Sequence, residues 1–199
     1  MIVNHSKTLL HQKITSLSKI SDASLEKLFE TSIQNQLVKG SILLKQGQIC
    51  KSVFFIEKGY VRTFMDKDGI EINIDFTLEG NFTTNLKSLR NNTPSDVVIQ
   101  AGEALTVYEF DKDRLLQLYH VSAEIESFGR KLLEQLLIAS EEHANLFKMF
   151  SPTERYQYLL TDKPEMLQRI SLSQLASYLG IARETLSRIR KKNTGKKIM

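Results

Sequence analysis

The chain has 199 residues, of which 41% are hydrophobic and 25% are charged, and its formal net charge is +4. This composition is typical of a globular protein that forms one large or two small domains around a substantial core. It excludes a membrane protein, because no apolar run approaches the ~20 residues of a membrane span.

The cysteine content and the N-terminal sequence exclude further kinds of site and of protein. Cys50 is the only cysteine, which excludes an internal disulfide, an iron–sulfur cluster and a Cys-rich zinc site. The histidines, His5, His11, His120 and His143, show no metal-ligand spacing. The N-terminus lacks the apolar core of a signal peptide, so we expect a cytoplasmic protein.

Positive charge is concentrated at the C-terminal end. Residues 151–199 hold ten Lys and Arg against four Asp and Glu, a balance of +6 that leaves −2 for residues 1–150. Such an asymmetry favours attraction of phosphate by the C-terminal segment. The last residues, from Gly195 on, are interpreted as a solvated tail.

Residues 6–34 contain two helical patterns. No function can be assigned to them from sequence, and we expect both helices to serve packing. The first has an apolar stripe of Leu9, Leu10, Ile14 and Leu17. The second begins at Asp22 and turns Leu25, Leu28 and Phe29 inward.

Short strands punctuated by glycines are predicted from Gln36 to Leu118. The runs are Ile42–Leu44, Val53–Ile56, Val61–Met65, Ile70–Phe76, Val97–Ala101 and Leu105–Phe110. The sequence Asp-Lys-Asp-Gly at 66–69 predicts a hairpin turn with its glycine in the left-handed conformation. Many short strands with regular turns indicate a barrel or jelly roll that holds a ligand or docks a partner.

Residues 112–149 read as helix, broken near His120 to Ser122. The second part is long enough for a two-stranded seam between two copies of the chain. Its apolar and small residues recur at spacings of three and four: Ile125, Phe128, Leu132, Leu136, Ala139, His143 and Leu146. A fresh helix and a domain boundary follow, because Ser151, Pro152 and Glu154 form a capping-box pattern with proline at the first helical position.

Leu172 to Lys192 has the pattern of a helix-turn-helix. Gly180 lies between two helical runs, and Ala176 precedes it by four residues, where a small side chain lets the second helix cross closely. Leu186 and Ile189 dock the second helix on the first. The remaining face carries Arg183, Glu184, Ser187, Arg188, Lys191 and Lys192. Arginine matches the acceptor pair of guanine, glutamate can accept from cytosine, and lysines suit phosphates, so this face predicts DNA binding.

A barrel, a long helix and a C-terminal helix-turn-helix, in this order, resemble the Crp/Fnr superfamily of regulators over nearly the whole chain. The matching stretches are LLKQGQICKSVFFIEKG at 43–59 and SPTERYQYLL with the helix-turn-helix that follows. The resemblance implies an α+β chain in three parts. Residues 1–120 form a jelly-roll barrel with N-terminal helices, 121–150 a dimerisation helix, and 151–199 the DNA-binding domain.

The resemblance also assigns contacts and partners. Arg183, Glu184 and Arg188 stand at positions that touch base edges in the family. The backbone contacts fall to Ser173, Thr185, Ser187, Lys191 and Lys192. The implied partners are double-stranded DNA with a pseudo-palindromic operator, a second copy of the chain and RNA polymerase.

The nucleotide-binding positions depart from the family pattern. Members that bind cyclic nucleotides carry a Gly-Glu pair and an Arg-Ser pair, where this chain has Gly80-Asn81 and Ser95-Asp96. Loss of the phosphate-binding arginine, with Asp96 beside it, argues against cyclic AMP and leaves the effector unassigned, with no cofactor expected. Arg90 is the alternative phosphate ligand. The candidate effector pocket is Gly80, Asn81, Ser95, Asp96 and Ser140.

The leading hypothesis is a homodimeric, sequence-specific transcription regulator. The alternative is a cyclic-nucleotide-binding sensor that acts through protein contacts, its helix pair being a docking surface. No nucleophile–base motif, metal-ligand spacing or phosphate loop indicates an enzyme.

Overall fold

The structure is a computed structural model that describes residues 8–195. His5 and residues 196–199 of the predicted tail lie outside this range.

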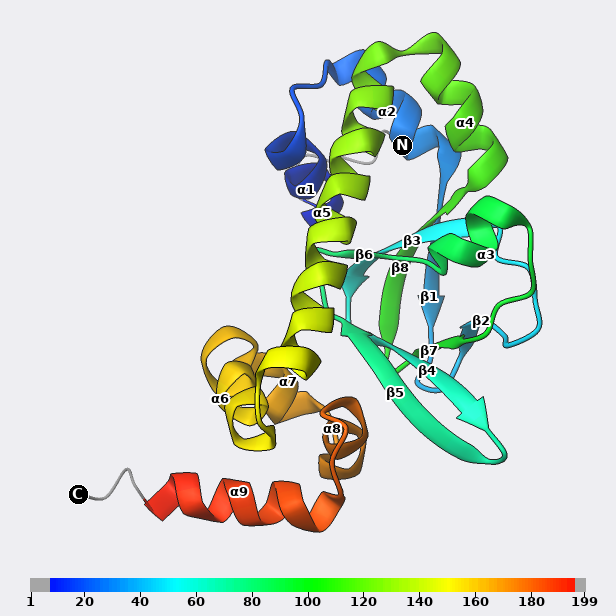
Figure 1. The fold of residues 1–199 in the computed structure, drawn as a ribbon. Helices are drawn as coiled ribbons and strands as arrows, with labels where there is room; N and C mark the ends of the chain where they lie inside the picture. Colours follow the sequence, from blue (N-terminus) through cyan, green and yellow to red (C-terminus); the bar gives the residue numbers. More distant parts are fainter. Residues whose placement is uncertain (1–7, 196–199) are drawn as a thin grey trace.

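Eight strands form two antiparallel sheets that face each other, as the jelly-roll prediction requires (Figure 1). One sheet has the order β1-β8-β3-β6 and the other β2-β7-β4-β5. The strands are β1 (Ser32–Leu37), β2 (Ile42–Leu44), β3 (Ser52–Lys58), β4 (Val61–Lys67), β5 (Ile70–Thr77), β6 (Phe82–Thr83), β7 (Val98–Ala101) and β8 (Leu105–Asp111). The core between them includes Ile56, Val61 and Ile99, each fully buried, because alternate residues of a strand point to the same face.

The β4–β5 hairpin has the turn that the sequence predicts. Lys67 pairs with Ile70, and the two residues between them have positive φ, 55° at Asp68 and 82° at Gly69. This is the geometry of a two-residue type I′ turn, which matches the twist of the flanking strands.

Several elements differ from the prediction. The chain enters β1 at Ser32, where the helical reading continued to residue 34. β6 has two residues and α3 (Leu86–Asn91) has six, and neither was predicted. Both are too short to show a period in sequence, and α3 depends on the Asn85 side chain, which accepts a hydrogen bond from the Ser88 N–H.

Four further helices surround one end of the barrel: α1 (Leu9–Leu17), α2 (Asp22–Thr31), α4 (Lys112–Val121) and α5 (Ala123–Met149). The predicted break between the last two is confirmed at Ser122, whose side chain caps α5 by accepting from the Ile125 N–H. A second core joins α1, α2 and the start of α5 to the outer face of the β3–β8 sheet through Ile14, Leu28, Phe55 and Phe110.

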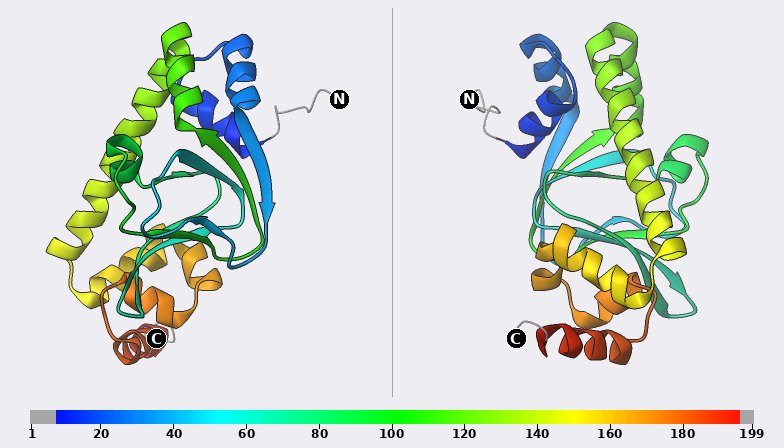
Figure 2. Two further views of the ribbon diagram at one scale, coloured as in Figure 1. Left: turned by 90° about the vertical axis from the view of Figure 1, so that its right-hand side faces the viewer. Right: turned by 60° about the vertical axis from the view of Figure 1, so that its left-hand side comes forward.

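The C-terminal part contains α6 (Pro152–Asp162), α7 (Pro164–Arg169), α8 (Leu172–Tyr178) and α9 (Arg183–Gly195). The capping box of Ser151 and Glu154 and the proline at the start of α6 are confirmed. These helices lie beneath the barrel (Figure 2), where α8 packs against β5. Tyr60 and Phe76 of the barrel belong to the same core as Leu159, Leu175 and Leu186, so the two parts are packed together.

No helix of the described residues is both long and apolar enough to cross a membrane.

Candidate functional site

The apolar and charged faces of α9 lie as the sequence predicts. Leu186 and Ile189 are buried in the C-terminal core, with exposed fractions of 0% and 7%. The charged residues Arg183, Glu184, Arg188, Lys191 and Lys192 are exposed, and Thr185 and Ser187 are half-buried between the two faces. Arg188 donates to the Thr185 hydroxyl at 3.2 Å, which holds the guanidinium along the helix surface. One outer face of α9 therefore carries four cations and one carboxylate.

The turn between α8 and α9 is closed by its backbone. Gly180 has a φ of +64°, which L residues with a Cβ rarely adopt. The N–H of Ile181 then donates to the carbonyl of Ala176 at 3.0 Å, and Ala176 is buried against the crossing helix. Arg155 of α6 donates to the Leu179 carbonyl, so the turn is also held from outside. Ser173 is exposed on the first turn of α8.

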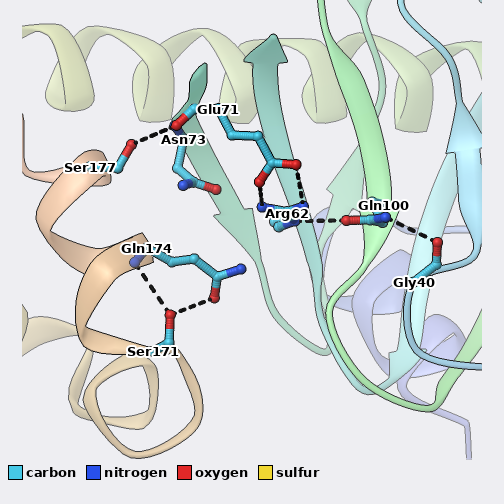
Figure 3. Close-up of polar contacts among 8 residues, drawn as sticks. All are labelled: Gly40, Arg62, Glu71, Asn73, Gln100, Ser171, Gln174 and Ser177. Atoms are coloured by element: carbon cyan, nitrogen blue, oxygen red, sulfur yellow. Dashed lines mark hydrogen bonds and ion pairs between the residues drawn. The ribbon is translucent and has the colours of Figure 1, made fainter. Parts of the chain in front are cut away.

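α8 is bonded to the edge strand β5 of the barrel (Figure 3). The Ser177 hydroxyl accepts from the backbone N–H of Asn73 at 2.9 Å and donates to the carbonyl of Glu71 at 3.3 Å. The Glu71 carboxylate in turn binds Arg62, and Arg62 donates to Gln100 at 2.8 Å. A polar network thus continues from the helix pair into the sheet.

A second contact between the two parts centres on Arg169 of α7. Its guanidinium donates two hydrogen bonds of 2.7 Å to the Glu79 carboxylate, pairs with Glu103, and lies 5.4 Å above the Tyr60 ring. Burial alone would raise the pKa of Glu79, but the hydrogen bonds from Arg169 and the Gly59 N–H lower the pKa below its ordinary value. The pair is therefore charged at neutral pH.

His143 of α5 contacts the same helix pair. Its Nδ1 lies 3.3 Å from the Tyr178 hydroxyl, and its ring lies 5.0 Å from that of Phe147. Burial lowers the pKa of His143, although Asp75 opposes this shift. Burial also raises the pKa of Tyr178, so the phenol stays protonated and can donate to the neutral imidazole.

The predicted seam residues do not share a free face of α5. Ile125, Phe128 and Leu146 are buried within this chain, so the prediction that they face a partner is wrong. Leu132, Leu136 and His143 are half-buried, and of the seven only Ala139 is exposed. The large apolar side chains that α5 leaves exposed include a group in its middle, Leu133, Leu137 and Ile138, at 49%, 70% and 56%, besides Phe147 and Met149 at its end. The helix is amphipathic, but its regular stripe packs on its own barrel.

The candidate effector-pocket residues are not gathered in one cavity either. Asn81 lines a cavity of about 280 Å³ between β6 and α5, and Gly80, Ser95, Asp96 and Ser140 do not. Ser140 is exposed on α5. The Ser95 hydroxyl is buried, donates to the Val97 carbonyl at 2.7 Å and accepts from Asn85 at 2.9 Å.

Residues 34–122 match the family model of the cyclic nucleotide-binding domain. No curated protein matches the sequence as a relative.

Solved structures show the fold of the whole chain. FixK2 from Bradyrhizobium japonicum has a TM-score of 0.70 at 18% identity, covering 84% of this chain and 86% of that one. CLP, the c-di-GMP responsive global regulator of Xanthomonas campestris, has 0.65 at 19%, with 89% and 94% covered. A Crp/Fnr-family protein from Eubacterium rectale has 0.65 at 16%, with 89% and 85% covered. The chain therefore has the fold of the Crp/Fnr regulators.

The Ser95-Asp96 pair, which the resemblance places where the family holds phosphate, carries a negative charge. Asn85 donates to Asp96 at 3.1 Å, and this hydrogen bond, helped by Lys87, lowers the pKa of the Asp96 carboxyl. Asp96 is thus ionised at neutral pH, and the Ser95 hydroxyl is already used within the loop.

Sequence reasoning missed the residues that join the two parts. Arg169 and Glu79 belong to no predicted motif, and Ser177 had no assigned role within the helix-turn-helix pattern. The Arg169–Glu79 and Ser177–Asn73 bonds join residues 90 and 104 positions apart. The only local feature that could have pointed to this contact was Arg169 next to the buried Ile170. An arginine beside an apolar residue is too common to indicate an ion pair.

Proposed function

We propose that this Crp/Fnr-fold protein is a homodimeric regulator that binds a specific DNA sequence through α9. The observation that carries the proposal is the outer face of α9, where Arg183, Arg188, Lys191 and Lys192 are exposed on a helix anchored by buried Leu186 and Ile189. Base-reading helices of this motif present such a face to the major groove.

The residues have separate roles in the proposed complex. Arg183, Glu184 and Arg188 read base edges, because arginine donates bidentately to guanine and glutamate accepts from cytosine. Ser173, Thr185, Ser187, Lys191 and Lys192 contact phosphates, which fixes the register without reading sequence.

The proposed dimer uses the exposed apolar face of α5. Leu133, Leu137 and Ile138 lie within six residues on a helix of 27 residues, and all three are exposed. Pairing of this face in two copies would bury it and bring two α9 helices to successive major grooves about 34 Å apart. RNA polymerase is a further proposed partner.

Cyclic AMP is not the proposed effector. A ligand phosphate at Ser95 and Asp96 would meet an ionised carboxylate, and no arginine stands at either position. Loss of one charge-assisted hydrogen bond alone weakens binding roughly 10- to 150-fold.

The proposal is tested by selecting bound sequences from random duplex DNA with the full-length protein. We expect a pseudo-palindrome whose half-sites are about one helical turn apart. Recovery of random sequence would contradict it, as would half-sites with no fixed spacing.

A further inference from the structure

One cavity of the described residues lies outside the nucleotide-binding positions. It has a volume of about 400 Å³ and is lined by residues of β3, β6, α3, α4 and α5. Neither Gly80 nor Asn81 nor the Ser95-Asp96 pair lines it. The volume is within the range of small-molecule sites, about 300–1,000 Å³.

The floor of the cavity is aromatic and buried. Phe82, Phe110 and Phe128 are 6%, 3% and 5% exposed, and the Phe82 ring lies 6.2 and 6.0 Å from the other two. Its rim is apolar but open to water, since Leu86, Leu116 and Leu133 are 47%, 41% and 49% exposed. An apolar ligand body would cover this rim and gain about 25 cal/mol for each Å² removed from water.

Two cations line the same cavity. Arg90 is exposed near the end of α3, and no hydrogen bond or ion pair of its guanidinium is found within residues 8–195. The Lys112 ammonium donates to the Asn92 side chain at 3.0 Å, which places it beside the end of the same helix. Among the described residues that line the cavity, none is acidic. The charged residues that line the cavity are therefore both cations.

We propose that this cavity binds an apolar monoanion, namely a carboxylate with an aliphatic or aromatic body, as the effector of the regulator. The carboxylate binds Arg90 and Lys112, and the body lies on Phe82, Phe110 and Phe128. The Tyr119 hydroxyl supplies a further polar group in the wall. This role as effector rests on the proposed function, whereas the binding itself does not.

The cavity is connected to the DNA-binding part by one helix. Phe128, Leu132 and Leu136 of α5 line it, and the same helix contacts Tyr178 of α8 through His143. A ligand that favours one position of α5 would change DNA affinity, and DNA would change ligand affinity by the same factor.

The test is calorimetry with decanoate, dodecanoate and phenylacetate, and with decanol as the uncharged probe, on the full chain without DNA. We expect at least one carboxylate to bind and decanol to bind more weakly. Arg90→Gln and Lys112→Gln should each weaken carboxylate binding roughly 10- to 150-fold, as expected for a lost charged hydrogen bond. Their decanol affinity should not change. Arg130→Gln on α5, an exposed arginine outside the cavity, is the matched control.

Three results would overturn the proposal: no binding of any carboxylate, equal affinity for decanoate and decanol, or full carboxylate affinity in both variants. A Leu133→Trp variant at the rim should also lose binding. Sedimentation with and without decanoate tests whether a second copy of the chain occupies the cavity in place of a ligand. In that case ligand binding and self-association would be mutually exclusive, which would also contradict the proposal. Because no DNA is present, failure here is distinguishable from failure of DNA recognition.

Discussion

Arg183 and Arg188 are close in sequence to Leu186 and Ile189, yet they differ completely in exposure. The proposed DNA recognition requires this difference, since the buried neighbours fix the helix while the arginines stay exposed. The exposed arginines and the buried apolar residues could all be assigned from sequence. Helical spacing and side-chain chemistry give the same assignment over one short segment.

Replacing either arginine should remove sequence discrimination. We expect Arg183→Ala or Arg188→Ala to cost about 1–3 kcal/mol of preference at a few base pairs while weak nonspecific binding persists. Competition binding with operator and scrambled DNA measures this, and Arg130→Ala is the control. Full discrimination in both variants would show that the base contacts are assigned wrongly.

Gly180 is a stability site at the same scale. An alanine there must adopt a φ near +64°, and its Cβ would lie 3.3 Å from Nη1 of Arg155. We expect Gly180→Ala to lower the free energy of unfolding by about 1–2 kcal/mol, and Gly180→Asn to cost less, since asparagine tolerates this conformation. Urea denaturation compares the two, and equal midpoints for Gly180→Ala and the parent would refute the assignment.

At the scale of elements, α5 shows where sequence reasoning succeeds and where it fails. Its length, its start at Ser122 and its amphipathic character follow from local pattern and capping. The direction in which its apolar face points does not follow from sequence. Ile125 and Phe128 have a spacing that suits packing on a partner helix and on the chain's own barrel equally well. The structure packs them on the barrel. Likewise the Arg169–Glu79 pair joins residues 90 positions apart, which one sequence does not reveal, and α3 is too short to show a helical period.

The contact between α5 and α8 should depend on pH. The folded-state pKa of His143 is below its ordinary value of 6.5, so the unfolded chain takes up the proton first as the pH falls. Stability from this residue is therefore complete above pH 6.5 and declines below it. We expect denaturation midpoints to fall from pH 7.5 to 5.5, and His143→Phe to reduce that fall.

His120 on α4 is exposed and provides the matched control, so His120→Phe should leave the pH dependence unchanged. Asp75 and Lys163, which face His143 with opposite effects on its pKa, are kept in both variants. An unchanged pH profile in His143→Phe would assign the acid sensitivity to other groups.

At the scale of the whole molecule, one chain leaves apolar surface that a second would cover. Leu137, at 70% exposure, is the most exposed leucine of α5. We expect Leu137→Glu to raise the dimer dissociation constant at least tenfold, or about 1.4 kcal/mol, because a charge replaces buried apolar surface. Analytical ultracentrifugation measures it, with Gln117→Glu on α4 as the control. A dimer of unchanged affinity would place the interface elsewhere.

The barrel and the C-terminal helices share one core, so any conformational change that separates them would depend on temperature in a characteristic way. Moving α8 away from β5 would bring Tyr60, Phe76 and Tyr178 into water, where they are now 5%, 3% and 2% exposed. Exposure of apolar surface increases heat capacity. The free-energy difference between the joined and separated forms would therefore depend on temperature along a curve rather than a straight line. If the protein regulates as proposed, a switch built this way would respond to warming and cooling as well as to the proposed ligand.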